Sequence, residues 1–112
     1  MKPTRYFSNK QETKVAKQLG GRKQSNSGAT AFAKGDVVAP DALIECKTLT
    51  KKQKTRTIEK EWYTKLNEEK LAMGKRLGLV VFDFGDGDNI VSMTMSDFIN
   101  LYEAWKEINE ND

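Results

Sequence analysis

A nearly continuous apolar run in the second half of the chain places the strictest limit on its fold. Residues 78–84 read Gly-Leu-Val-Val-Phe-Asp-Phe, and such a run predicts a strand that is buried on both faces of its sheet. A strand of this kind needs other structure packed against each face. Helical patterns occur before and after the run, so it predicts an α/β fold in which helices flank a central mixed sheet.

Helical spacing of apolar residues predicts three helices. The first spans residues 8–19, where Ser8 and Gln11 match a capping box. The second spans residues 57–74, with Thr57 as its cap. The third begins at Ser96, and its apolar residues share one face: Phe98, Leu101, Tyr102, Trp105 and Ile108.

The remaining segments predict strands and loops. Residues 29–47 are expected to form strand, turn and strand around Pro40-Asp41, and residues 90–95 a later strand. The polar segments 22–28 and 48–56 are expected to be loops. The order is therefore helix, strands, helix, strand, strand, helix, and 112 residues suffice for one domain.

Charge is unevenly distributed along the chain. Residues 1–60 carry 14 Lys/Arg against 5 Asp/Glu, or +9, whereas residues 61–112 carry 5 against 11, or −6. A basic half of this kind attracts polyanions, of which the phosphate backbone of nucleic acid is the usual one. A solvated charged surface without any partner is the alternative interpretation of the charge alone.

Missing residue types narrow the chemistry. The chain has no histidine, which excludes Ser-His-Asp and Cys-His catalysis and zinc sites built on imidazole. Its one cysteine, Cys46, makes no internal disulfide, and the first residues lack a secretory signal, so we expect a cytoplasmic location. No apolar run approaches the roughly 20 residues that span a bilayer, so we expect no membrane partner.

One apolar hairpin carries a cluster of charged residues. If residues 40–41 form a two-residue turn, Asp36 lies directly opposite Glu45. Opposed residues on antiparallel strands project to the same face, with Cβ atoms about 4.5 to 5.5 Å apart. Lys47 shares that face because side chains alternate along a strand. The hairpin therefore predicts two carboxylates and an amine on one surface.

This cluster has the chemistry that phosphodiester hydrolysis requires. A few carboxylate oxygens hold Mg²⁺ and leave waters in its shell, so Asp36 and Glu45 are candidate ligands and Lys47 is a candidate for handling the attacking water. Asp41 is a poor partner, because four residues along one strand place it roughly 13 Å from Glu45. A surface ion pair between Glu45 and Lys47 is the alternative, but the apolar neighbours of Glu45 predict burial and favour function.

Glu12 is a further carboxylate of interest. It precedes the apolar residues Val15, Ala16 and Leu19 by three, four and seven positions, which places it on the helix stripe that faces the core. Two interpretations carry equal weight. Glu12 is either an edge residue that reaches to solvent or a group directed into a site.

The motifs together resemble a known nuclease superfamily. Gly-Asp at 35–36, a short hairpin and Ile-Glu-Cys-Lys at 44–47 resemble the PD-(D/E)xK nucleases. The helix with Glu12 and the Ser-Asn-Ser-Gly-Ala segment at 25–29 are similar to archaeal-type and phage Holliday junction resolvases. The resemblance covers about residues 8–84. It implies a single nuclease domain over 1–112, whose restriction-endonuclease-like core (helix, three strands, helix, strand) is followed by an extra strand and a C-terminal helix.

The resemblance also implies roles for individual residues. It implies Mg²⁺ or Mn²⁺ bound by Asp36, Glu45 and the backbone carbonyl of Cys46, with Lys47 as a catalytic residue. Glu12 matches the glutamate of the family's first helix and is counted with the catalytic residues. Ser27 is a looser match to a serine that some resolvases carry before the aspartate.

Cations on both sides of the hairpin are candidates for holding phosphates, with solubility as their alternative role. The candidate DNA-binding residues are Arg22, Lys23, Ser27, Lys51, Lys52, Lys54 and Arg56. Lys14 and Lys17 are weaker candidates. The aromatic rings of Trp62, Tyr63 and Trp105 could stack on bases, but at helical spacing such residues more often belong to a core.

The sequence thus predicts a metal-dependent endonuclease acting on DNA, with branched DNA as the expected substrate. Symmetric cutting of a four-way junction needs two sites, so the family resemblance implies a homodimer, for which the apolar face of the last helix could supply the interface. Three rivals stay open: a nuclease of the same fold that acts on linear DNA, a DNA-binding module without catalysis, and a nuclease directed at RNA.

Overall fold

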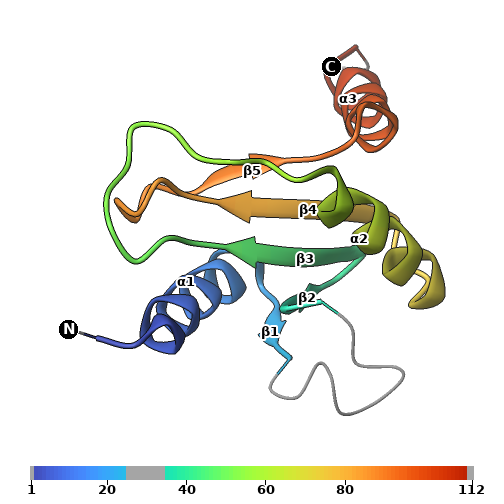
Figure 1. Ribbon diagram of the computed structural model, residues 1–112. Coiled ribbons are helices and arrows are strands. Elements are labelled where there is room, and N and C mark those ends of the chain that lie inside the picture. The colour runs from blue at the N-terminus through green and yellow to red at the C-terminus, as the bar shows by residue number, and fades with distance from the viewer. Residues whose placement is uncertain (1, 25–34, 111–112) are drawn as a thin grey trace.

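The computed structural model describes residues 2–24 and 35–110 (Figure 1). Three helices and five strands follow one another in the described residues. They are α1 (Thr4–Leu19), β1 (Arg22–Lys23), β2 (Val37–Ala39), β3 (Ala42–Lys47), α2 (Lys60–Ala72), β4 (Leu77–Phe82), β5 (Ile90–Ser92) and α3 (Met95–Glu110).

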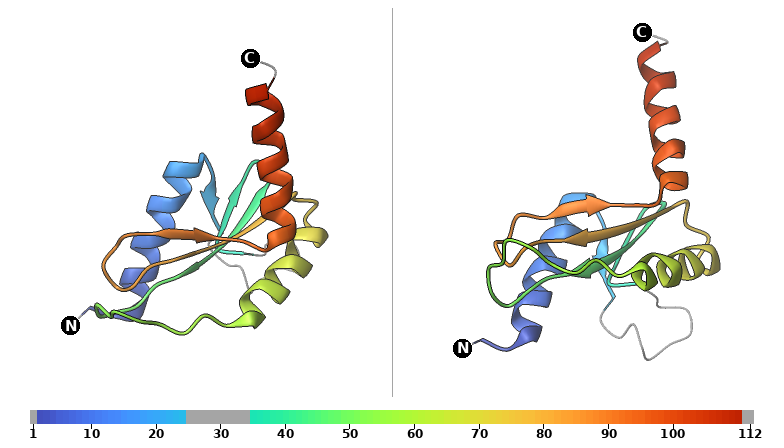
Figure 2. Two further views of the ribbon diagram at one scale, coloured as in Figure 1. Left: turned by 90° about the horizontal axis from the view of Figure 1, so that it is seen from above. Right: turned by 45° about the horizontal axis from the view of Figure 1, so that its top comes forward.

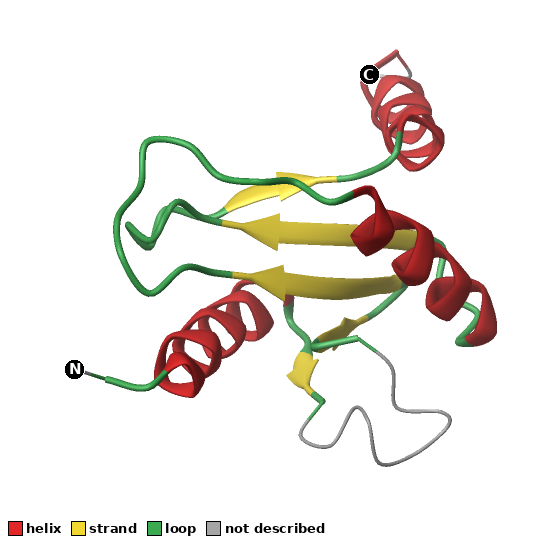
Figure 3. Cartoon of the chain, viewed as in Figure 1, coloured by secondary structure: helices red, strands yellow, loops and turns green. Residues whose placement is uncertain are grey.

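The strands form one mixed sheet in the order β1-β2-β3-β4-β5. Strands β3 and β4 are parallel, and the other neighbours are antiparallel. A parallel pair requires a crossover connection, which the chain makes through α2 (Figure 3). The predicted α/β class, with a mixed sheet flanked by helices, is confirmed.

Helices α1 and α2 cover opposite faces of the sheet (Figure 2). Val15 and Ala16 of α1 pack with Ile44 and Val81 on one face. Leu66 of α2 packs with strand residues on the other face, namely Val38, Leu43 and Val80. Alternate residues of β4 therefore enter separate cores, and Val80 and Val81 are both fully buried. This confirms the burial on both faces that the apolar run predicts.

All three helices begin elsewhere than their caps predict. Helix α1 begins at Thr4, so the capping box at Ser8 is wrong: Ser8 lies inside the helix and Gln11 is buried. Helix α2 begins at Lys60, beyond Thr57. Helix α3 begins at Met95, and the cap is Thr94, whose hydroxyl accepts a hydrogen bond from the Asp97 amide at 3.3 Å. Most of the stability of a helix in a protein comes from packing against the rest of the fold, so a local cap motif does not by itself fix the residue at which the helix begins.

Several strand boundaries also differ from expectation. Arg22 and Lys23 form the edge strand β1, paired with β2, where a loop was predicted. Strand β4 ends at Phe82 and β5 at Ser92, earlier than the residue pattern indicates. Residues 29–34 of the segment 29–47, predicted as strand, turn and strand, lie outside the described residues, as does Ser27.

Helix α3 is attached to the body mainly at its first turn. Asp97, 4% exposed, accepts a hydrogen bond from the Gly78 amide at 2.8 Å and pairs with Lys70 of α2 at 3.0 Å. Beyond this turn the helix projects away from the sheet (Figure 2). No helix within residues 2–24 and 35–110 is both long and apolar enough to cross a bilayer.

Candidate active site

The β2–β3 hairpin has the predicted register. Ala39 pairs with Ala42 across a two-residue turn, in which Asp41 adopts a φ of 63°. The amide of Asp36 donates to the Ile44 carbonyl at 2.9 Å. The predicted register is confirmed from Val37–Ile44 to Ala39–Ala42. Asp36 precedes β2, and its amide bonds to the carbonyl of Ile44, the partner of Val37, so the pairing is offset by one residue there.

Gly35 allows Asp36 to reach this position. Its φ is 77°, in the left-handed region that favours glycine. A Cβ at this residue would also lie 2.6 Å from the Leu43 side chain, which is a clash. A glycine is therefore required before Asp36, because only a residue without a side chain lets the backbone pass this close to Leu43 of β3.

The carboxylates of Asp36 and Glu45 interact at the end of the hairpin. Asp36 Oδ2 accepts a hydrogen bond from the Cys46 amide at 2.8 Å, which holds it beside β3. The pKa of Glu45 is raised to about 7, first because the side chain is buried and then because of the negative charge of Asp36. Two carboxylates held this close strongly favour a cation between them.

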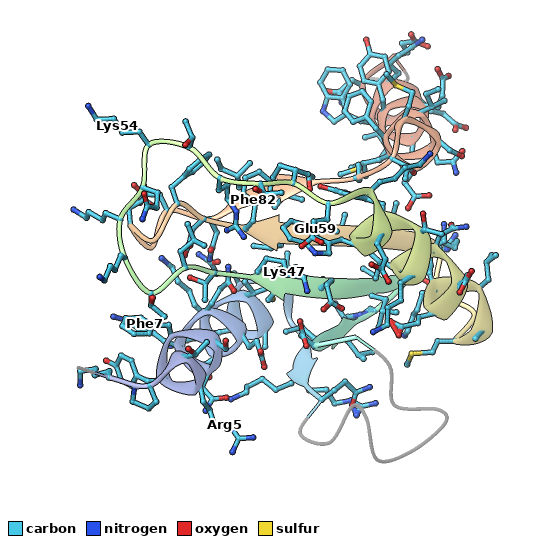
Figure 4. All side chains as sticks on the ribbon, in the orientation of Figure 1. Arg5, Phe7, Lys47, Lys54, Glu59 and Phe82 are labelled. Atoms are coloured by element: carbon cyan, nitrogen blue, oxygen red, sulfur yellow. The ribbon has the colours of Figure 1, made fainter. Side chains whose placement is uncertain are left out.

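Lys47 supplies a positive charge on the same side of β3. Its Nζ lies 3.5 Å from Glu45 Oε1 and lowers the pKa of that carboxyl, although burial and Asp36 outweigh it. The ammonium also lies 5.2 Å from the centroid of the Trp62 ring. Figure 4 labels Lys47 at the carboxyl end of β3. The ring of Trp62 on α2 therefore makes a cation–π contact with Lys47 beside the site, in addition to its packing in the core.

Glu12 lies half-buried on α1, close enough to Asp36 for their charges to interact. The pKa of Glu12 is raised, first by burial and then by Asp36, whereas Lys23 lowers it. The same neighbours surround Cys46, whose thiol pKa is raised by burial and by the charges of Asp36 and Glu12. Of the two interpretations of Glu12, this placement favours the one directed toward the site. Leu19, by contrast, is exposed and not part of the core.

Sequence reasoning missed Gln11. This residue is 5% exposed, and its Nε2 donates to the Lys47 carbonyl at 3.0 Å and to Asn89 Oδ1 at 3.2 Å. It thereby joins α1 to the end of β3. The available signal was its position four residues before the buried Val15, on the same stripe of the helix.

Arg56 differs from the other loop cations. Its Nη1 donates to the carbonyls of Lys47 and Asp83, and its guanidinium lies 5.5 Å from the Trp62 centroid and 5.6 Å from that of Phe82. These contacts tie together the carboxyl ends of β3 and β4. The geometry gives Arg56 a structural role at the site, and the phosphate contact suggested by its sequence position stays a prediction.

The buried carboxylate of Asp83 also stabilises the segments at the carboxyl ends of β3 and β4. Its oxygens accept from the Thr48 hydroxyl at 2.8 and 3.0 Å, and Oδ1 also accepts from the Gly85 amide at 3.0 Å. Gly85 packs against the Lys51 backbone with a φ of 79°, so a side chain is excluded there. The loop after Lys47 is therefore fixed to the β4–β5 turn.

The other predicted DNA-binding cations are exposed in two places. Arg22 and Lys23 lie on edge strand β1, and Lys51, Lys52 and Lys54 lie on the loop after β3. Figure 4 labels Lys54 at the outer part of that loop. Asp41, which geometry excludes from the site, is exposed and pairs with Arg76 at 2.7 Å, and the hydrogen bond lowers its pKa.

Comparison with known proteins finds no match to this chain among protein-family models, curated proteins or solved structures.

The donor set suits a hard divalent cation. Carboxylate and carbonyl oxygens are the ligands that Mg²⁺ and Mn²⁺ prefer. Asp36 and Glu45 supply two carboxylates close enough to interact, and the Cys46 carbonyl stays the third ligand that the resemblance implies. In the described parts of the chain, no group of three His, Cys, Asp or Glu side chains converges to hold a metal by itself. Coordination at this hairpin would accordingly combine two carboxylates with a backbone oxygen and water.

The raised pKa of Glu45 predicts a pH-dependent stability of the metal-free protein. Its pKa is about 7 when folded, against an ordinary 4.5, so the folded state binds the proton more tightly. The contribution to stability is therefore full below pH 4.5 and is lost as the pH rises through 7. The loss is expected to be on the order of 1 to 3 kcal/mol. Urea unfolding across this range should show a smaller decline in Glu45→Gln, and equal declines in both proteins would contradict the assignment.

Proposed function

We propose that this chain is a metal-dependent endodeoxyribonuclease of the PD-(D/E)xK type, with α1, β1, β2, β3, α2 and β4 as its restriction-endonuclease-like core. One observation carries the proposal. The charge of Asp36, beside β3 at the end of the hairpin, raises the pKa of Glu45, and Lys47 lies next to Glu45. The order of elements in the described residues agrees with the order that the resemblance implies.

In this proposal Asp36, Glu45 and the Cys46 carbonyl hold Mg²⁺ or Mn²⁺. When bound, the cation supplies Lewis-acid chemistry at the scissile phosphodiester. Lys47 orients the attacking water through its Nζ and offsets the negative charge that develops on the phosphate. Gln11 and Arg56 position Lys47 by binding its backbone carbonyl. Glu12, beside Asp36, is placed to accept a hydrogen bond from water at the edge of the site.

DNA is the proposed substrate because cations flank the carboxylate cluster. Lys23 lies close enough to Glu12 to lower its pKa, and the exposed lysines at 51, 52 and 54 follow Lys47 directly along the chain. Contacts of this kind hold the phosphate backbone and set its register without reading sequence. The proposal uses Arg22, Lys23, Lys51, Lys52 and Lys54 for this purpose, in a protein expected in the cytoplasm.

Branched DNA is the preferred substrate within this proposal, and a substrate panel tests it. The protein is incubated with Mg²⁺ and a four-way junction, its separate linear arms, a single strand and the matching RNA. A resolvase should incise the junction at paired positions at least about tenfold faster than the arms, a difference of about 1.4 kcal/mol in barrier. Equal rates on linear DNA favour the general nuclease. Binding without cleavage under Mg²⁺ and Mn²⁺ favours the non-catalytic module, and preferential cutting of RNA favours the RNA nuclease.

A further inference from the structure

A cavity of about 410 Å³ lies at the carboxyl ends of the parallel strands β3 and β4. Three segments line it, and Figure 1 shows them close together at this edge of the sheet: the first part of α1, the loop that follows β3, and the β4–β5 turn. Ligands of open α/β sheets bind in crevices at the carboxyl ends of parallel strands, and typical ligand pockets have volumes of roughly 300 to 1,000 Å³. Both the position and the size of the cavity therefore suit a small organic group.

Two buried polar side chains line the cavity, Gln11 of α1 and Asp83 at the start of the turn, which are 5% and 3% exposed. The Nε2 of Gln11 donates to the Lys47 carbonyl at 3.0 Å and to Asn89 Oδ1 at 3.2 Å. These two acceptors fix the orientation of the amide, and its Oε1 is buried with no donor among the described residues. An unpaired buried acceptor is unfavourable, so the cavity favours a ligand that brings an N–H or O–H donor.

The two sides of the cavity carry opposite charges. Lys10 and Lys14 lie four residues apart on α1, and therefore on the same face of the helix. Asp86 and Asp88 belong to the turn, where the Asp88 amide donates to Asp86 Oδ1 at 3.0 Å and lowers the pKa of that carboxyl. All four side chains are exposed. A ligand that is anionic at one end and rich in donors at the other end matches this distribution of charge.

Half-buried apolar side chains complete the lining, Phe7 of α1 and Leu49 of the loop. Figure 4 labels Phe7 near this loop, which leaves β3 directly after Lys47. An aromatic ring offers a flat apolar surface on which a nucleobase stacks, whatever the base. The cavity thus combines three features that bind a nucleotide: cations for its phosphate, a ring for its base, and acceptors for the N–H groups of that base.

We propose that the cavity binds one unstacked nucleotide of the DNA substrate, with its phosphate at Lys10 and Lys14 and its base against Phe7. The identity of the ligand rests on the proposed nuclease function, because cleavage at Lys47 brings a DNA strand to this edge of the sheet. Gln11 connects the two places, since it lines the cavity and donates to the Lys47 carbonyl. Unpairing and unstacking a base cost free energy, so the cavity favours branched or single-stranded DNA over a continuous duplex.

The acceptors of the cavity also distinguish between bases. Adenine, cytosine and guanine each carry an exocyclic amino group, whereas thymine carries none. The N–H donors of such a group suit the Oε1 of Gln11 and the carboxylates of Asp86 and Asp88. We therefore expect a nucleotide of cytosine to bind at least about threefold more tightly than one of thymine, a difference that one additional hydrogen bond supplies.

Nuclear magnetic resonance of the isotope-labelled full chain, without metal, tests the site. The probes are the monophosphates of deoxycytidine and thymidine, and inorganic phosphate alone. Both nucleotides should shift the side-chain amide signals of Gln11 and the backbone signals of Gly85 and Gly87, and phosphate alone should bind more weakly than either. Unchanged signals at these residues, or equal affinities for all three probes, would show that no nucleotide is recognised there and would overturn the proposal.

Exposed substitutions test the two charged sides separately. Lys10→Gln removes a charge at the phosphate and should weaken binding of both nucleotides at least about threefold. Lys65→Gln makes the same change in charge on the exposed side of α2 and should leave binding unchanged. Asp88→Asn should reduce the preference for the cytosine nucleotide. Equal effects of the two lysine substitutions, or an unchanged preference in Asp88→Asn, would overturn the assigned orientation of the nucleotide.

These titrations need neither metal nor cleavage, so the cavity and the nuclease assignment fail separately. Nucleotide binding at Gln11 without any cleavage of DNA under Mg²⁺ and Mn²⁺ would refute the nuclease and retain the cavity. Cleavage of DNA by a chain whose Gln11 signals do not respond to nucleotides would refute the cavity alone.

Discussion

Asp36→Asn is expected to lower Mg²⁺-dependent cleavage by about a thousandfold or more while DNA binding is retained. Asparagine has the shape of aspartate and its Oδ1 still accepts from the Cys46 amide, so the hairpin should keep its fold. The substitution removes one of the two negative charges that the proposed cation requires. Glu45→Gln should have a similar effect, since it removes the other. Cleavage is measured on the best substrate of the panel, and binding by fluorescence anisotropy in Ca²⁺.

Asp41→Asn is the matched control. It makes the same chemical change in the same hairpin, five residues further along, but Asp41 is exposed and pairs with the exposed Arg76. Cleavage by this variant should stay within about twofold of wild type, because an exposed ion pair contributes little. Activity of Asp36→Asn within tenfold of wild type would refute the metal site. Equal losses in both variants would mean that the hairpin fold, and not the carboxylate, was affected.

The hairpin could be predicted because its geometry is local. The turn residues Pro40 and Asp41 and the alternation in the following strand specify the register of β2 against β3, and Asp36 comes directly before the paired residues. Strand β4 could be predicted because an uninterrupted apolar run has few alternatives. Both inferences use residues close together in sequence, so a single sequence contains the necessary information.

The support of the site could not be predicted, because it depends on distant residues. Gln11 meets the Lys47 carbonyl across 36 positions of sequence, and Arg56 meets the Asp83 carbonyl across 27. A buried glutamine looks like a capping residue, and a loop arginine looks like a phosphate ligand, until the fold brings these carbonyls together. Polar side chains that satisfy backbone groups at strand ends leave no periodic signal.

The exposure of α3 also could not be predicted, because it depends on residues far from the helix in sequence. Its apolar spacing predicts a buried face, and the spacing is present. Periodicity identifies the face but not the surface that covers it, which can belong to the same chain or to another copy. In this fold only the start of α3, at Asp97, is buried against the body.

Asp97→Ala is expected to lower the free energy of unfolding by about 3 to 5 kcal/mol. Asp97 Oδ1 lies 3.0 Å from Lys70 Nζ, with the two side chains 6% and 10% exposed, and Oδ2 accepts from the Gly78 amide. Alanine leaves the buried ammonium of Lys70 without its counter-charge and the Gly78 amide without its acceptor. A loss of this size should lower the melting temperature by more than about 10 °C, measured by thermal and urea unfolding.

Two comparisons separate the charge from the packing. Asp41→Asn removes the charge that pairs with Arg76, whose side chains are 57% and 80% exposed. Asparagine tolerates the φ of 63° at this position, so the change should cost less than about 1 kcal/mol. Lys70→Met combined with Asp97→Asn removes both charges and keeps an acceptor for Gly78, so it should be markedly more stable than Asp97→Ala. Equal stability of these two Asp97 variants would show that the lost packing at the start of α3, and not an uncompensated lysine, accounts for the effect.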